Sequence, residues 1–141
     1  MTVREIMTTP AITIAPDATV YDAAKLMEQH NVGSIPVAEG SVLTGIITDR
    51  DITVRSTAQK RDPQGLHVYE IMTRNVATVT PDTNVTDALY LMSETRTRRL
   101  PVVAGKRLVG ILSLGDTATE DAFSMEASHA LAEISRPCRV R

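Results

Sequence analysis

The chain has 141 residues, 43% of them hydrophobic and 23% charged, which is typical of a globular protein and excludes a fibrous or strongly disordered chain. The formal net charge of −2 argues against a general nucleic-acid binder, and no apolar run approaches the roughly 18 residues that span a bilayer. The single cysteine, Cys138, cannot form an internal disulfide, and the N-terminus lacks the features of a signal peptide. We therefore expect a cytoplasmic location.

A repeat with an offset of 65 residues dominates the sequence. From Val3 to Asp51, 20 of 49 positions are identical to the residues 65 positions later, without a gap. The match begins with Val3–Thr8 against Val68–Thr73. Because a duplicated unit of this size usually buries its apolar face against its copy, we expect the two copies to fold alike and to pack together.

Each copy begins with the same pattern of a strand followed by a helix. Residues 11–14 and 76–79 alternate between apolar and polar side chains, which predicts a short strand. Thr19 and Asn84 are good N-caps, and the apolar residues that follow them recur at helical spacing. Asn31 is a plausible end of the first helix.

A hairpin and a second helix follow in each copy. The apolar runs Ser34–Ala38 and Leu43–Thr48 flank a glycine turn and predict two paired strands, with a helix beginning near Asp49. The second copy gives the same pattern at Leu100–Ala104, Leu108–Ser113 and Leu114. The order of elements in each copy is therefore β-α-β-β-α.

The remaining segments are a polar linker and a C-terminal helix. A stripe with a step of about four predicts a helix that covers a core, or alternatively a contact with a dimer mate or partner, and Pro137 is expected to end it; the stripe comprises Phe123, Ala127, Leu131 and Ile134. We divide the chain into a first repeat (1–56), a linker (57–66), a second repeat (67–120), and a C-terminal helix and tail (121–141).

Both copies carry an apolar-Pro-Val triplet and, after a glycine turn, the pattern Gly-apolar-apolar-Thr/Ser-x-x-Asp. In the first copy these are Ile35–Val37 and Gly45–Asp51, and in the second they are Leu100–Val102 and Gly110–Asp116. The pattern resembles the signature of the cystathionine-β-synthase (CBS) domain family. The resemblance covers nearly the whole chain, and its two copies are in register.

The resemblance implies an α/β (α+β) fold in which the tandem β-α-β-β-α repeats pack about a pseudo-twofold axis, the arrangement called a Bateman module. In this family two clefts between the repeats hold an adenosyl ligand such as AMP, ADP, ATP or S-adenosylmethionine. Its members commonly form homodimers and act as regulatory sensors rather than as catalysts. We therefore expect such a ligand, a homodimer and a separate target protein, with no catalytic cofactor and no metal.

The family pattern also assigns roles to individual residues. The carboxylates of Asp51 and Asp116 would accept hydrogen bonds from the two ribose hydroxyls, because a charged acceptor forms the stronger bonds. Thr48 and Ser113 would bind the ribose or the nearest phosphate. The first site would combine Thr48, Arg50 and Asp51 with Val76, Thr78, Arg98, Arg99 and Leu100. The second site would combine Ser113 and Asp116 with Ala11, Thr13, Ser34 and Ile35.

The two expected sites differ in their charge. Arginine suits phosphate through its planar fork of donors, and the first site holds Arg50, Arg98 and Arg99. In the second site Gly115 stands where Arg50 stands in the first, and Gly33 and Ser34 replace the arginine pair. We predict that the first site binds a phosphorylated ligand. The second site would be empty, weak, or suited to an uncharged adenosyl group.

Other interpretations of these residues remain open. Asp51 and Asp116 are also suited to capping a helix N-terminus, and Arg96, Arg98 and Arg99 to a solvated loop with ion pairs. The leading hypothesis is a stand-alone adenine-nucleotide sensor, and the alternative is a scaffold or stress-associated interaction protein with vestigial clefts. The chain carries none of the enzyme motifs that we searched for, such as GxxxxGKS, GxGxxG or GxSxG, so we expect no enzymatic activity.

Overall fold

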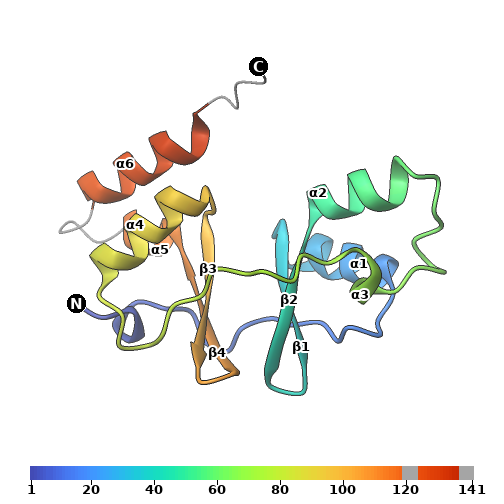
Figure 1. Cartoon of the computed structure of the whole chain (residues 1–141), viewed down its shortest axis with the longest axis horizontal. Coiled ribbons are helices and arrows are strands. Elements are labelled where there is room, and N and C mark those ends of the chain that lie inside the picture. The colour runs from blue at the N-terminus through green and yellow to red at the C-terminus, as the bar shows by residue number, and fades with distance from the viewer. Residues whose placement is uncertain (119–123, 137–141) are drawn as a thin grey trace. The chain divides into compact units, whose positions relative to one another are not determined.

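The computed structural model of the protein describes residues 1–118 and 124–136. The chain forms two compact units. We call them the N-unit, Ala11–Val76 with Lys106–Leu108, and the C-unit, Met1–Pro10, Ala77–Gly105 and Val109–Arg141. Each unit contains both helices and strands (Figure 1), which confirms the predicted α/β (α+β) class.

From its first helix to the helix after the hairpin, the N-unit follows the predicted order of elements. Thr19 caps the first helix by accepting a hydrogen bond from the Asp22 amide at 3.1 Å. Asn31, in the left-handed conformation with φ 53°, ends this helix as predicted. The elements are α1 (Val20–His30), β1 (Ser34–Glu39), β2 (Val42–Thr48), α2 (Asp49–Ile52), the π-helix η2 (Thr53–Thr57) and α3 (Val68–Ile71).

The C-unit repeats this pattern and adds a helix. The Asn84 side chain caps the helix equivalent to α1 by accepting a hydrogen bond from the Thr86 amide at 3.0 Å. The strands β3 and β4 are hydrogen-bonded neighbours, as β1 and β2 are in the N-unit. The elements are the 3-10 helix η1 (Val3–Glu5), α4 (Val85–Thr95), β3 (Arg99–Ala104), β4 (Arg107–Ser113), α5 (Leu114–Ala118) and α6 (Ser124–Ser135).

The predicted first strand of each copy is reduced to a single bridge. Ile14 pairs with Val37, and Val79 pairs with Val102, in both cases in the parallel sense. Within residues 11–14 only Ile14 is buried. The rest of each segment, residues 11–13 and 76–78, pairs with no strand. The prediction of a strand over the whole segment was therefore wrong.

The leading segments of the two repeats are exchanged between the units. Thr8, from the start of the first repeat, exchanges two backbone hydrogen bonds of 2.8 and 3.0 Å with Ile111 in the C-unit. Thr73, from the start of the second repeat, does the same with Ile46 in the N-unit, at 2.8 and 2.9 Å. Each unit is therefore completed by the opening residues of the other repeat.

Two glycines let these segments approach the strands. A Cβ at Gly45 would lie 2.7 Å from the Thr73 carbonyl oxygen and 2.9 Å from the Met72 sulfur. A Cβ at Gly110 would lie 3.0 Å from the Thr8 carbonyl oxygen. Since a hydrogen bond fixes each carbonyl, the backbone cannot move away without losing its pairing.

Each unit has its own aliphatic core, which the hairpin and the helices enclose. The side chains that are fully buried include Ile35, Val37 and Ile47 in the N-unit, and Leu100, Val102 and Leu112 in the C-unit. Full burial of a side chain of this size stabilises the fold by about 1.5–3 kcal/mol. The strands that carry the family motif are thus anchored by their own apolar residues.

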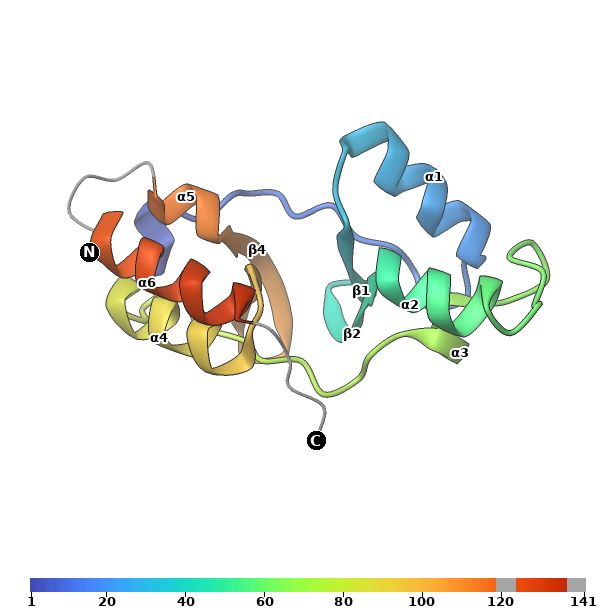
Figure 2. The same ribbon diagram turned by 90° about the horizontal axis from the view of Figure 1, so that it is seen from above.

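Helix α6 covers the C-unit core, as Figures 1 and 2 show by its position along α4 and α5. Ala127 is buried at 3% exposure and Ile134 is half-buried, as the predicted stripe requires, whereas Leu131 is 42% exposed. Phe123 and Pro137, which belonged to the same prediction, lie outside the described residues.

Arg96 fastens the C-terminal end of α6. Its guanidinium donates hydrogen bonds to the carbonyl oxygens of Glu133 at 3.3 Å and Arg136 at 2.8 Å. A cation at this end also complements the helix dipole. Arg96 therefore has a structural role that separates it from Arg98 and Arg99.

We expect Gly45→Ala to lower the free energy of unfolding by about 1–3 kcal/mol, because the added methyl group overpacks the Thr73 contact. Gly110→Ala should cost less, since its nearest contacts are longer. Gly65→Ala is the control, because its Cβ would meet no atom closer than 3.9 Å. Urea denaturation measures the free energy of unfolding of the three variants. Equal decreases for Gly45→Ala and Gly65→Ala would contradict the prediction.

Candidate functional site

In the N-unit, the predicted site residues gather where β2 ends and α2 begins. Thr48 is the N-cap of α2 and Asp51 is its third helical residue. The Thr48 amide donates to Asp51 Oδ2 at 3.0 Å, and the Asp51 amide donates to Thr48 Oγ1 at 3.0 Å. This is a reciprocal capping box, in which Thr48 rather than Asp51 is the N-cap. The alternative interpretation of Asp51 as the N-cap is therefore wrong.

Asp51 is unusual among the capping residues because it is buried, with 8% of its surface exposed. Arg55, four residues later, places a guanidinium nitrogen 3.8 Å from Asp51 Oδ1. The same nitrogen of Arg55 donates to the Ile71 carbonyl oxygen at 2.8 Å, which holds the side chain in place. A buried carboxylate generally needs such a partner. The sequence analysis missed Arg55, although its spacing of four residues from Asp51 was a usable signal.

The hairpin brings Ser34 to the same place, because Ser34 pairs with Thr48 across β1 and β2. Arg50 is exposed beside Asp51. Ile35 is 1% exposed and belongs to the core, so only its main chain could meet a ligand. The other predicted residues of this unit are accessible, with Thr13 exposed and Ala11 and Val76 half-buried.

The C-unit repeats the capping box at the start of α5. The Ser113 amide donates to Asp116 Oδ2 at 3.0 Å, and the Asp116 amide donates to Ser113 Oγ at 3.1 Å. The Thr8 hydroxyl also lies 3.5 Å from Asp116 Oδ2. Gly115 occupies the position that Arg50 holds in the N-unit, so the C-unit box lacks a basic residue at this helix position.

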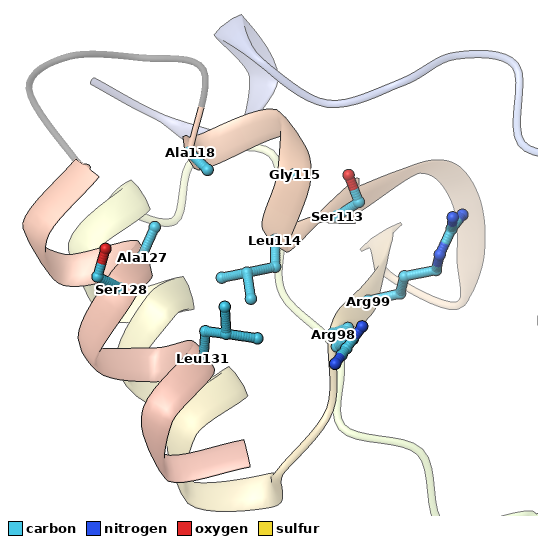
Figure 3. Close-up of a pocket in the computed structure, with 9 residues that line it drawn as sticks. All are labelled: Arg98, Arg99, Ser113, Leu114, Gly115, Ala118, Ala127, Ser128 and Leu131. Carbon is cyan, nitrogen blue, oxygen red and sulfur yellow. The ribbon is translucent and has the colours of Figure 1, made fainter. Parts of the chain in front are cut away.

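Arg98 and Arg99 lie beside this box, since the Leu114 amide donates to the Arg98 carbonyl oxygen at 2.7 Å. Neither guanidinium forms a hydrogen bond or an ion pair with any residue in 1–118 and 124–136. Leu100 is 1% exposed in the core, and Thr78 is half-buried. Within this unit, the arginine pair and Ser113 line one pocket (Figure 3).

The spacing Thr-x-x-Asp does not by itself identify a ligand site. Thr19 and Asp22 form the same capping box at the start of α1, with bonds of 3.2 and 3.1 Å. Asp22 is exposed, however, whereas Asp51 is buried and paired with Arg55. Burial and the basic partner therefore distinguish the candidate site from an ordinary helix start.

A search of the described residues for metal sites found no group of three or more His, Cys, Asp and Glu side chains that could hold an ion. In the same residues, none of the helices has the length and apolar character that a membrane span requires.

We expect Asp51→Ala to lower the free energy of unfolding by about 1 kcal/mol or more, because it leaves the half-buried Thr48 amide without its acceptor. Asp51→Asn should cost less, since the amide oxygen can still accept that bond. Asp22→Ala, in the exposed box, should cost no more than about 1 kcal/mol. Thermal and urea unfolding of the three variants test this order, and a larger loss for Asp22→Ala would refute it.

Comparison with known proteins finds one domain match around each of the two capping boxes. The CBS domain matches at residues 3–56 and 68–121. The CBS domain-containing protein YhcV of Bacillus subtilis is 46% identical over 133 residues, which is 94% of each chain.

Two solved structures have the same fold. The CBS domain pair of protein MJ0100, in complex with 5′-methylthioadenosine and S-adenosyl-L-methionine, is 32% identical with a TM-score of 0.76 and covers 88% of this chain and 98% of its own. Hypoxic Response Protein I, with two coordinated zinc ions, is 30% identical with a TM-score of 0.79 and covers 85% and 98%. The chain therefore belongs to the CBS domain family, and it carries two copies of the domain.

Proposed function

We propose that the chain is a regulatory module of the cytoplasm that binds an adenosyl ligand and signals its occupancy to a separate protein. The ligand is AMP, ADP, ATP or S-adenosylmethionine. The observation that carries the proposal is the pair of equivalent capping boxes, Thr48–Asp51 and Ser113–Asp116, in a family whose member MJ0100 binds two adenosyl compounds. The role is regulatory and not catalytic.

The chemistry of Asp51 suits a ribose. Its carboxylate has about four lone-pair positions, of which the Thr48 amide uses one. Arg55 faces the second oxygen at 3.8 Å and holds the side chain in position. The remaining acceptor positions can receive the two ribose hydroxyls, and bonds to a charged acceptor are about twice as strong as neutral ones.

The distribution of charge supports two unequal sites. Arg50 and Arg55 lie in the N-unit with Asp51. The family pattern adds Arg98 and Arg99 to the same site, while within the C-unit this pair lies beside the Ser113–Asp116 box. The guanidinium groups of this added pair have no partner among the described residues, so they are available to phosphate. We therefore assign the phosphorylated ligand to the Asp51 site. The Asp116 site is weak, empty, or occupied by an uncharged adenosyl group.

A sensor needs two states with different affinities for its ligand, since a ligand that binds both states equally shifts nothing. We propose that the protein works as a homodimer and that a target protein distinguishes its ligand-bound state from its free state.

One observation favours the alternative of a scaffold with vestigial clefts. The Thr48–Asp51 box is sufficient to start α2, as the Thr19–Asp22 box is sufficient to start α1, and neither needs a ligand. A scaffold would retain Asp51 for folding alone. Binding measurements on a variant that preserves the cap separate the two functions.

We expect calorimetric titration of the ligand-free protein to detect binding of AMP, ATP or S-adenosylmethionine. Asp51→Asn should weaken the binding of a phosphorylated ligand by roughly 10-fold or more, because it removes the charge that strengthens the ribose bonds. It retains the acceptor for the Thr48 amide, so the fold is preserved. Asp116→Asn should change the affinity for the same ligand by less than about twofold.

Asp22→Ala serves as the matched control, because it breaks an equivalent capping box outside the proposed sites. Its affinity should equal that of the unmodified protein. Equal losses in Asp51→Asn and Asp116→Asn would contradict the assignment of the ligand to one site. No heat with any of the three ligands, from folded protein, would favour the scaffold.

A further inference from the structure

A pocket of about 390 Å³ opens in the C-unit between the start of β3, helix α5 and helix α6. Its walls include Arg98, Arg99, Leu114, Gly115, Ser128 and Leu131 (Figure 3). All these residues belong to the C-unit, and helix α6 supplies one whole wall. Since the family match ends at residue 121, this wall lies outside the repeated domain.

The pocket has one cationic end and one apolar end. Arg98 lies at its edge, is exposed, and forms no ion pair or hydrogen bond through its side chain with any described residue. Opposite it, the side chains of Leu114 and Leu131 point toward one another, whereas that of Arg99 extends away from α6 (Figure 3). Arg98 is thus the cation that a ligand between the two leucines would meet.

The apolar end is built from a helix face that the core does not use. Ala127 and Ala130 of α6 are buried at 3% and 1% exposure, while Leu131 remains 42% exposed beside them. Gly115 leaves the opposite wall without a side chain where the other copy has Arg50. The volume lies at the lower end of the range of about 300–1,000 Å³ that small-molecule sites occupy.

We propose that this pocket binds a small organic anion, whose carboxylate or phosphate group pairs with Arg98 while its apolar body lies between Leu114 and Leu131. Ser113 and Ser128 add hydroxyl groups along the wall. The pocket shares Arg98, Arg99 and Ser113 with the proposed adenosyl sites. It differs from them because its apolar end, with Ser128 and Leu131, comes from α6, and because it needs neither Asp51 nor Asp116. A bound ligand connects α6 to β3, so occupancy of the pocket stabilises the position of α6.

The test is calorimetric titration of the full chain with octanoate and with phenyl phosphate, which carry the two head groups. Inorganic phosphate and octanol are the ligand controls, since phosphate offers only the anionic group and octanol offers only the apolar chain. We expect at least one of the two probes to bind roughly 10-fold more tightly than either control, because both ends of the pocket contribute. If neither probe binds, or if a control binds as tightly as the better probe, the proposal is overturned.

Substitutions of the pocket residues test whether the probe binds in the pocket. Arg98→Gln should weaken its binding roughly 10-fold, while Arg107→Gln, which removes an equal charge at the start of β4, should leave it within about twofold. Leu131→Glu should abolish binding by placing a negative charge between the leucines, and Leu131→Met should retain it. Unchanged affinity in both Arg98→Gln and Leu131→Glu would overturn the proposal. Arg98→Gln keeps the test valid if Leu131→Glu displaces α6, which circular dichroism reveals.

The same variants separate this site from the adenosyl site. Leu131→Glu should leave the binding of AMP or ATP unchanged, and Asp51→Asn should leave the binding of the probe unchanged. Failure of the adenosyl titration together with binding of octanoate or phenyl phosphate would reject the proposed function alone. Loss of probe binding in Asp51→Asn would show that the probe occupies the adenosyl site and would overturn the separate pocket.

Discussion

The pairing of each leading segment with a strand of the other repeat is the constraint on which the rest of the fold depends. Thr73 lies against Ile46, and Thr8 against Ile111, at the two glycines whose missing side chains make room for it. The paired residues of β2 and β4 lie two positions before the capping boxes. The position of each candidate carboxylate is therefore fixed by a contact that the other repeat provides.

The capping box gives one group of atoms two tasks. At Thr48 and Asp51 it starts α2, and it also orients the carboxylate proposed to bind the ribose. A folding requirement thus positions a functional group without a separate support, because the bonds that the helix start needs also fix the side-chain angle. Arg55 adds the charge that makes burial of this carboxylate tolerable, whereas the exposed Asp22 needs no such partner.

Local structure could be predicted from the sequence where its signal is local. Thr19, Asn31 and Asn84 mark helix ends because capping depends on neighbouring backbone groups, and the structure confirms all three. The strand predicted over residues 11–14 failed because its alternation is not matched by burial. The exchange of segments could not be foreseen, since Val3–Thr8 and Val68–Thr73 are nearly identical and either could complete either unit.

The candidate site was predicted only in part, because its motif is local in the sequence whereas the contacts of its arginines are not. The motif located Asp51 and Asp116, but the structure was needed to separate Arg96, which holds α6, from Arg98 and Arg99. The sequence pattern left open whether Leu131 covers the core or contacts a partner. In the structure Ala130 is buried in the core, and Leu131 is exposed and lines the pocket. An apolar spacing of about four residues does not determine which of two neighbouring helix residues faces the core.

The exchanged segments also constrain how such a chain could have originated. In this chain the segment that pairs with the strand of each repeat comes from the other copy. An ancestor with one repeat and the same exchange would have been a dimer of two molecules with swapped opening residues. Fusion of two such repeats in one chain would convert a concentration-dependent association into an intramolecular one. After fusion the copies were free to diverge, and arginine could replace glycine and serine in one copy without disturbing assembly.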